Sequence, residues 1–257
     1  MDTGAVITAR DGAVGIVRLC REDKLNALDL AARKALACAF EELAADDAIR
    51  VIIVTGGKKV FAAGADLALL AGKGSGAIRA LDLLGYWRPV AECTKPVIAA
   101  VSGYALGAGC ELALMCDIII ADSSAQFGLP ESRVGIMPGA GGTQRLVRVL
   151  GKHVTSHLLM TGGTLDAGRA YALGLVCELA QDGGTEALAL EHAKRIARQP
   201  PLALQAIKRA LAVGADLPLT AANALENREF LLLFDSDDAQ EGIAAFLEKR
   251  RPLFKGV

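Results

Sequence analysis

Histidine is scarce in this sequence, with only His153, His157 and His192 among 257 residues. His153 and His157 are four residues apart, but no glutamate follows His153 and no third ligand is near, so the features of a zinc site are missing. The features of a hydrolase triad are missing too, because Ser75 lacks the G-x-S-x-G spacing and Cys110 has no histidine partner. We therefore predict neither a metal site nor an activated nucleophile.

An excess of positive charge is also missing, and aromatic residues are few. The chain has 28 basic and 29 acidic residues, for a net charge of -1, and aromatic side chains make up 4% of it, with one Trp. Nucleic-acid sites combine clustered basic residues with aromatic side chains, and the sequence has no lysine-rich helix. We expect no nucleic-acid partner.

The usual marks of export and of a membrane span are absent as well. Residues 1–4 have neither the basic nor the apolar region of a signal peptide. The apolar run from Val97 to Ala121 contains Glu111 and Asp117, so a buried strand, glycine turn, helix and second strand explain it better than a span. The six cysteines form no C-x-x-C pair and lie among apolar neighbours, which favours reduced core residues. We expect a cytoplasmic protein with no membrane partner.

Glycine-rich segments are plentiful, but none has the spacing of a nucleotide-binding loop. Gly107-Ala-Gly-Cys-Glu-Leu and Gly139-Ala-Gly-Gly-Thr-Gln both depart from G-x-G-x-x-G, and no P-loop lysine follows either. Nicotinamide cofactors and nucleoside triphosphates are therefore not expected.

The order of the predicted elements favours an α/β fold. Residues 6–10 and 14–19 predict a β-hairpin, and Asp29 is expected to cap a helix that runs to Asp46. A strand, a small-residue turn and a helix then occur twice, at 51–69 and at 97–115. This recurrence predicts a coil of similar β-β-α units rather than one open doubly wound sheet.

The rest of the chain is predicted to be mainly helical. Helices are expected at 77–92, 146–150, 155–160, 166–171, 185–198, 201–213, 220–234 and 237–249, with a short strand at 175–177. We place a boundary near Gln199, so that residues 1–199 form the core with the active site and residues 200–257 form a helical region. Leu225 and residues 230–234 offer more apolar surface than a small appendage needs, which indicates a subunit interface.

Two carboxylates stand in apolar, glycine-rich surroundings. Glu111 follows a glycine-rich turn and is expected in the first turn of a helix, and Glu131 follows Gly128-Leu-Pro. A glutamate in an apolar run is often simply turned to solvent, and that alternative stays open for Glu111. Burial and a second nearby carboxylate both raise a carboxyl pKa, so two such groups facing one cavity could share a proton near neutral pH. This pair predicts general acid-base catalysis.

The turns themselves suit the chemistry of an anion. Unpaired N–H groups at the start of a helix point outward, with the positive end of the helix dipole behind them. Two such turns from separate units could converge on one oxygen and stabilise an enolate. The two carboxylates and the N–H groups of the two turns together suit proton transfer next to a carbonyl. A thioester is a good substrate class for this chemistry, because its α-proton is acidic enough for a carboxylate to move.

At these residues the sequence resembles the enoyl-CoA hydratase/isomerase (crotonase) family, and the resemblance covers essentially the whole chain. The motifs that carry it are Phe61-Ala-Ala-Gly-Ala-Asp-Leu, Gly103-Tyr-Ala-Leu-Gly-Ala-Gly-Cys-Glu-Leu-Ala, Phe127-Gly-Leu-Pro-Glu, Gly135-Ile-Met-Pro-Gly-Ala-Gly-Gly-Thr-Gln-Arg-Leu and Lys249-Arg-Arg-Pro-Leu-Phe-Lys-Gly. The family implies a crotonase-like spiral of β-β-α units with a C-terminal helical trimerisation region. It also implies a homotrimer or a homohexamer.

The resemblance assigns roles to particular residues. The thioester oxygen would be held by the backbone N–H groups of Ala65 and Ala108, the latter standing where the family usually has glycine. Glu111 and Glu131 match the two catalytic glutamates of the hydratases: one would deprotonate water for attack at Cβ, and Glu131 would deliver the proton to Cα. The segments that would contact coenzyme A supply Lys24, Ala27, Ala63, Asp66, Leu67 and Gly139. Coenzyme A would be part of the acyl-CoA substrate, so no separate cofactor is expected.

The leading hypothesis is hydration of a trans-2-enoyl-CoA to the 3-hydroxyacyl-CoA. Within the family, the motifs beginning at Phe127, Gly135, Pro201 and Phe246 look most like bacterial 2,3-dehydroadipyl-CoA hydratases of phenylacetate breakdown. The alternatives are Δ3-Δ2 enoyl-CoA isomerisation, which needs one carboxylate, and a non-catalytic scaffold that binds acyl-CoA or RNA.

Overall fold

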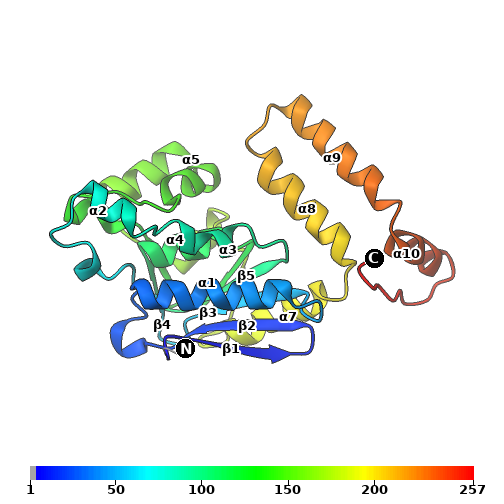
Figure 1. Ribbon diagram of the computed structural model, residues 1–257, viewed down its shortest axis with the longest axis horizontal. Helices are drawn as coiled ribbons and strands as arrows, with labels where there is room; N and C mark the ends of the chain where they lie inside the picture. The colour runs from blue at the N-terminus through cyan, green and yellow to red at the C-terminus, as the bar shows by residue number, and fades with distance from the viewer. Residues whose placement is uncertain (1–3) are drawn as a thin grey trace.

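A computed structural model describes residues 4–257, and two β-sheets form its framework (Figure 1). The larger sheet has the order β1-β2-β3-β5-β7-β10, and the smaller has the order β4-β6-β8-β9. The larger sheet comprises β1 Val6–Asp11, β2 Val14–Leu19, β3 Val51–Thr55, β5 Val97–Val101, β7 Ile118–Ala121 and β10 Glu178–Leu179. The smaller comprises β4 Val60–Ala62, β6 Tyr104–Leu106, β8 Gln126–Gly128 and β9 Leu165–Asp166.

The repeating unit is visible in how consecutive strands are shared between the sheets. Strands β3, β5 and β7 lie side by side and parallel in the larger sheet, and each is followed by β4, β6 or β8 in the smaller one. The chain therefore coils through both sheets three times. Two of these units were predicted from the sequence, and the structure adds a third, which begins at β7.

Ten labelled α-helices occur among residues 4–257. They are α1 Leu30–Ala45, α2 Ser75–Ala80, α3 Arg88–Ala91, α4 Ala108–Met115, α5 Gly142–Thr161, α6 Ala167–Ala172, α7 Thr185–Ile196, α8 Pro201–Gly214, α9 Leu219–Leu233 and α10 Asp237–Leu247. Helix α5 consists of two helical segments separated by a kink at Gly151, where φ is 71° and ψ is 170°. The short 3-10 helices are η1 Glu22–Lys24, η2 Leu67–Leu69, η3 Gly85–Trp87 and η4 Pro130–Val134. In this described part of the chain, no helix combines the length and the apolar character that a membrane span requires.

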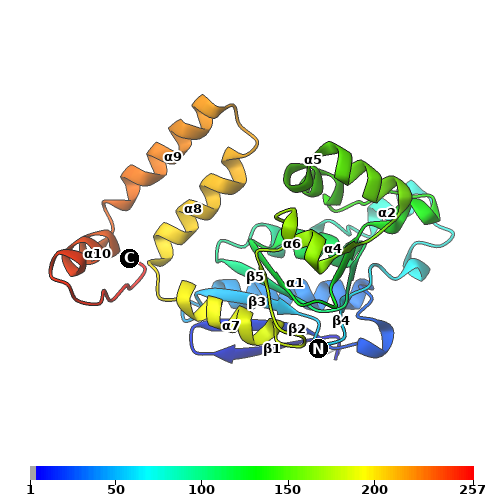
Figure 2. The same cartoon turned by 180° about the vertical axis from the view of Figure 1, so that it is seen from behind.

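Both faces of the larger sheet are covered, which explains why β5 is apolar throughout and β3 is apolar up to its last residue, Thr55. Helix α7 lies on one face and α1 on the other (Figures 1 and 2). In β3, Val51 and Ile53 pack in the cluster with α7, whereas Ile52 and Val54 pack in the cluster with α1. Successive side chains of a strand point to opposite faces, so a strand covered on both sides is apolar at every position.

The predictions of a β-hairpin and of a capped helix near the start of the chain are confirmed. Strands β1 and β2 pair antiparallel from Val6 with Leu19 to Asp11 with Val14. The Asp29 side chain accepts a hydrogen bond from the Ala32 N–H at 2.8 Å and caps α1 as expected.

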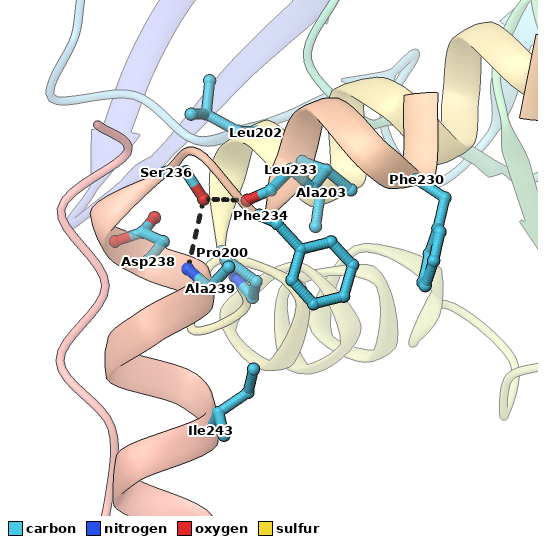
Figure 3. Close-up of a pocket in the computed structure, with 10 residues that line it drawn as sticks. All are labelled: Pro200, Leu202, Ala203, Phe230, Leu233, Phe234, Ser236, Asp238, Ala239 and Ile243. Carbon is cyan, nitrogen blue, oxygen red and sulfur yellow. Dashed lines mark hydrogen bonds between the residues drawn. The ribbon is translucent and has the colours of Figure 1, made fainter. Parts of the chain in front are cut away.

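Helices α8 to α10 form an arm that projects away from the sheets in both views (Figures 1 and 2). Helices α8 and α9 pack against each other, and the α9 side chains of Phe230, Leu231 and Leu232 are exposed. Within the arm, where α8 and α9 meet α10, is an apolar pocket (Figure 3). Its lining residues are Pro200, Leu202, Ala203, Phe230, Leu233, Phe234, Ser236, Asp238, Ala239 and Ile243. The arm thus presents an apolar surface, whose covering by another subunit stays a prediction.

Three predictions about local structure are wrong. The helix expected at 77–92 is broken into α2, η3 and α3, because Asp82 adopts a left-handed conformation with φ 46° and the chain turns there. The strand expected at 175–177 begins three residues later, since the N–H groups of Leu175 and Val176 both bond to the Ala170 carbonyl. Cys38 and Cys177 are exposed rather than in the core.

Candidate active site

A cavity of about 640 Å³ lies where the turns that follow β4 and β6 approach η4. Its wall is completed by residues of the segment from Leu67 to Trp87 and of the segment from Val134 to Ala140. Seven of the residues predicted to form the site line this cavity: Ala63, Ala65, Leu67, Ala108, Glu111, Glu131 and Gly139. Elements far apart in the sequence therefore meet here, which the spiral makes possible by stacking successive units.

Glu111 is held rigidly in the floor of the cavity. It lies in the first turn of α4 and its residue surface is 3% exposed. Its Oε1 atom accepts hydrogen bonds from the backbone N–H groups of Ala140 at 2.7 Å and Gly142 at 3.0 Å. The alternative that Glu111 is turned to solvent is therefore wrong. Two donors on one oxygen fix the carboxylate and leave the other oxygen available to a ligand.

Glu131 is held more loosely. It lies in η4 and is half-buried, and its Oε2 atom is buried without a hydrogen-bond partner among residues 4–257. Burial raises the pKa of the Glu131 carboxyl, a backbone hydrogen bond opposes that rise, and the Glu111 carboxylate adds to it. A raised pKa keeps more of this carboxyl protonated, as an acid that donates a proton requires.

The two glycine turns meet at the cavity wall. Gly64 and Gly107 have φ values of 118° and 51°, which favour glycine, and a Cβ on Gly107 would lie 3.6 Å from the Gly64 Cα. The same Cβ would lie 3.2 Å from Glu131 Oε1. The turns therefore touch each other directly beside a carboxylate, as the recurrence of the unit predicts.

The backbone N–H groups of Ala65 and Ala108 follow these turns. Ala108 opens α4, so its N–H has no acceptor within the helix. For neither N–H is a protein acceptor found in the described part of the chain. Free N–H groups beside buried carboxylates are suited to stabilise a developing oxyanion. That both groups bind one oxygen stays a prediction.

Three of the residues predicted to contact coenzyme A do not line the cavity. Lys24 is exposed in η1, and Ala27 lies just beyond it. The Asp66 side chain accepts a hydrogen bond from the Ala68 N–H at 2.9 Å and caps η2. The segment 24–28 nevertheless runs beside the cavity, because the Leu28 N–H donates to the Gly64 carbonyl at 2.8 Å. The role of these three residues stays a prediction.

Arg33 lines the cavity but was not among the predicted site residues. It is 4% exposed, its guanidinium lies 4.7 Å from the centre of the Trp87 ring, and its Nε–H donates to the Leu28 carbonyl at 3.1 Å. Burial lowers the pKa of Arg33, and the Glu111 and Asp29 carboxylates oppose that effect. The sequence did hold a signal, since Arg33 precedes the buried Leu36 and Phe40 by three and seven residues and so shares their helix face.

Among residues 4–257, no three His, Cys, Asp or Glu side chains are grouped so that they could hold a metal ion.

Residues 9–257 match the family described as enoyl-CoA hydratase/isomerase. The chain belongs to this family. It is 45% identical over 251 residues to the 2,3-dehydroadipyl-CoA hydratase of Escherichia coli K12, with 98% of each chain covered. It is 42% identical to a probable enoyl-CoA hydratase of Rhizobium meliloti, with 99% of each chain covered. The crystal structure of an enoyl-CoA hydratase from Bacillus anthracis superposes with a TM-score of 0.93 at 36% identity, covering 98% of this chain and 100% of that one.

Membership of the family confirms the resemblance inferred from the motifs, and with it the crotonase-like fold. The match spans both the two-sheet core and the helical arm, so neither part is foreign to the family. Glu111 and Glu131 both face the cavity, as the matching motifs predict.

Proposed function

We propose that this chain is an enoyl-CoA hydratase, which adds water across the double bond of a trans-2-enoyl-CoA to give the 3-hydroxyacyl-CoA. One observation carries the proposal. Glu111 and Glu131, from different units of the spiral, enter one cavity beside two glycine turns with free N–H groups. Hydration needs a base for water, an acid for Cα and donors for the enolate oxygen, and this set supplies all three.

In the proposed reaction one glutamate takes a proton and the other gives one. The Glu111 carboxylate takes a proton from water as the oxygen of that water bonds to Cβ, and the π electrons of the double bond move toward the thioester carbonyl. The N–H groups of Ala65 and Ala108 stabilise the negative oxygen of the resulting enolate. Glu131 gives its proton to Cα as the carbonyl re-forms. A proton returned from Glu111 to Glu131 restores the starting state.

We further propose that the substrate is 2,3-dehydroadipyl-CoA. The support is the 45% identity to a relative of that name over 98% of both chains. Coenzyme A enters as part of this substrate, so the reaction needs no separate cofactor.

The test is the loss of enoyl absorbance with crotonyl-CoA and with 2,3-dehydroadipyl-CoA, for the wild type and for Glu131→Gln. We expect rapid hydration by the wild type and a fall of about 10²- to 10⁴-fold in the variant, the usual range for one general acid. Glu92→Gln is the matched control, because Glu92 is exposed and, among residues 4–257, its one ion pair is with Arg88 at 3.8 Å. It should hydrate at the wild-type rate.

Two outcomes would contradict the proposal. Failure of the wild type to hydrate either ester, despite binding it, would mean that the site performs another enolate reaction such as Δ3-Δ2 isomerisation. Hydration at an undiminished rate by Glu131→Gln would mean that Glu131 is not the acid.

We also propose that the chain assembles as a homotrimer, or as a hexamer of two trimers. The exposed α9 side chains Phe230, Leu231 and Leu232 support this, since exposed apolar patches mark interaction sites. Light scattering after gel filtration should give three or six chain masses. Leu232→Glu should lower that mass, whereas a monomeric wild type would contradict the proposal.

A further inference from the structure

Arg33 is a buried cation with donors to spare. Its residue surface is 4% exposed, yet the only hydrogen bond found for its guanidinium in the described chain is from Nε–H to the Leu28 carbonyl. A guanidinium has five N–H donors. Its face is covered by the Trp87 ring at 4.7 Å, and the residue lines the cavity that holds both glutamates. Because that bond uses the Nε–H, the donors on Nη1 and Nη2 are left without a protein acceptor among residues 4–257.

No carboxylate among residues 4–257 pairs directly with this guanidinium, although the Glu111 and Asp29 carboxylates favour its charged form from a greater distance. Arg33 takes part in no ion pair within 4.0 Å among residues 4–257. Asp29, one helical turn earlier, is paired with Arg21 at 2.5 Å instead. Glu111 is near enough to affect the pKa of Arg33, but its Oε1 is occupied by two backbone donors. Buried charges are normally paired, so an unpaired one at a cavity wall points to a ligand of opposite charge.

The other cationic side chains of the cavity do not compete for this role. Lys73 and Arg79 also line it, but both are exposed and lie in or beside α2. The Asp82 carboxylate lines the cavity too, and it is likewise exposed. Most of the remaining wall between α2 and η4 is apolar, with Leu83, Trp87 and Ile136 among its residues. A carboxylate that entered this part of the cavity would lose its water, and a buried guanidinium offers the strongest compensation through paired, charge-assisted hydrogen bonds.

We propose that Arg33 binds a carboxylate at the far end of the acyl chain, and so selects enoyl-CoA substrates that end in an acid over those that end in a methyl group. The inference rests on the proposed hydratase function. It adds the residue that determines specificity and the chemical class of the group it recognises. In this arrangement the thioester lies at the glycine turns and the second carboxylate pairs with Arg33.

The experiment compares kcat/KM for 2,3-dehydroadipyl-CoA and for trans-2-hexenoyl-CoA, which has the same chain length and a terminal methyl group. The wild type should prefer the acid. Arg33→Gln should lower kcat/KM for the acid about 10- to 100-fold, the usual range for a hydrogen bond to a charged group, and leave hexenoyl-CoA within about 3-fold. Arg33→Lys should keep part of the preference because it retains the charge. Arg195→Gln is the matched control, because Arg195 is exposed in α7 and does not line the cavity, and it should leave the ratio unchanged.

A role through Glu111 would give a different result. If Arg33 only orients or supports Glu111, Arg33→Gln lowers kcat/KM for both substrates equally, and the proposal is overturned. An unchanged ratio of the two values overturns it as well. Thermal unfolding of each variant identifies a folding defect. If Arg33→Gln fails to fold, the wild-type kcat/KM values for the two esters provide the test, because a wild type with no preference for the acid contradicts the proposal.

A binding measurement distinguishes failure of the proposed hydratase function from failure of the proposed role of Arg33. Calorimetry with adipyl-CoA and hexanoyl-CoA, which cannot react, reports the preference even if neither enoyl ester is hydrated. Tighter binding of adipyl-CoA that is lost in Arg33→Gln supports the role of Arg33 whatever the reaction. Equal binding of the two esters by the wild type overturns it.

Discussion

Glu111 lies in the first turn of α4, is 3% exposed and accepts two backbone hydrogen bonds on one oxygen. By contrast, Glu131 lies in η4, is half-buried and has a buried oxygen that finds no hydrogen-bond partner among residues 4–257. Both follow a glycine in a tight segment of the spiral, yet the first is fixed in place and the second is free to change its protonation. This difference separates the two roles. An oriented carboxylate suits the base that positions water, and a carboxyl with a raised pKa suits the acid.

The largest effect should come from removing the oriented carboxylate. Glu111→Gln should lower kcat for hydration by about 10²- to 10⁴-fold, because the amide cannot accept the proton of water. Since every turnover requires both glutamates, which act as one catalytic unit, the double variant with Glu131→Gln should be little slower than the slower single variant. Steady-state rates with 2,3-dehydroadipyl-CoA would measure this. A double variant whose losses multiply would show that the glutamates act independently.

A smaller loss should follow from crowding the oriented carboxylate without removing it. A Cβ on Gly142 would lie 3.1 Å from Glu111 Oε1 and 2.7 Å from a methyl carbon of Leu129, so Gly142→Ala should displace Glu111. We expect a fall in kcat of about 10²-fold, typical of a misplaced catalytic group, and destabilisation by about 1–3 kcal/mol from overpacking.

The matched control for this crowding is Gly76→Ala. Gly76 is exposed in α2 and does not line the cavity, and a Cβ there would meet no atom within 4 Å. Its kcat should stay at the wild-type value and its melting temperature should not fall, since alanine is the better helix former. If Gly142→Ala were equally silent, the rigid positioning of Glu111 would not matter for the reaction.

The smallest effect is on stability, and its sign distinguishes Glu131 from an ordinary surface glutamate. Because the pKa of Glu131 is raised by folding, the folded state holds a proton that the unfolded state has lost between about pH 4.3 and the raised pKa. Wild-type stability therefore falls as the pH rises through this window. Glu131→Gln should melt at a higher temperature than the wild type at neutral pH, and the difference should vanish below about pH 4.

Glu241 provides a control of opposite sign. Hydrogen bonds from Arg250 and then from the Leu253 N–H lower the pKa of Glu241 to about 2. This group stabilises the fold above the unfolded pKa, and its contribution is lost as the pH falls toward 2. Glu241→Gln should therefore melt at a lower temperature than the wild type at neutral pH. Differential scanning calorimetry from pH 3 to pH 8 would measure both changes in melting temperature. If Glu131→Gln and Glu241→Gln shifted the melting temperature at neutral pH in the same direction, the contrast between the two glutamates would be contradicted.

Much of the fold could be predicted because local signals agreed with it. The hairpin of β1 and β2, the Asp29 cap and the long apolar strands all follow from turn residues, capping chemistry and periodicity. The strands of the smaller sheet were harder to find. Strands β4, β6 and β8 have three residues each, too few for an alternation to show, and their pairing depends on partners from neighbouring units. The break after Asp82 did carry a local signal, since Gly85 and Pro89 lie inside the predicted helix and both disfavour a helix interior.

For the site, the sequence by itself determined the chemistry: two glutamates beside glycine turns, with few histidines and no nucleotide-binding loop. Tertiary structure decided which of these groups face one cavity and how each is held. The hydrogen bonds that fix Glu111 come from Ala140 and Gly142, and the ring that covers Arg33 belongs to Trp87, all distant along the chain. Residue types and short-range spacing are encoded locally, but burial and partners arise only when the units of the spiral stack, because packing joins residues that the sequence keeps apart.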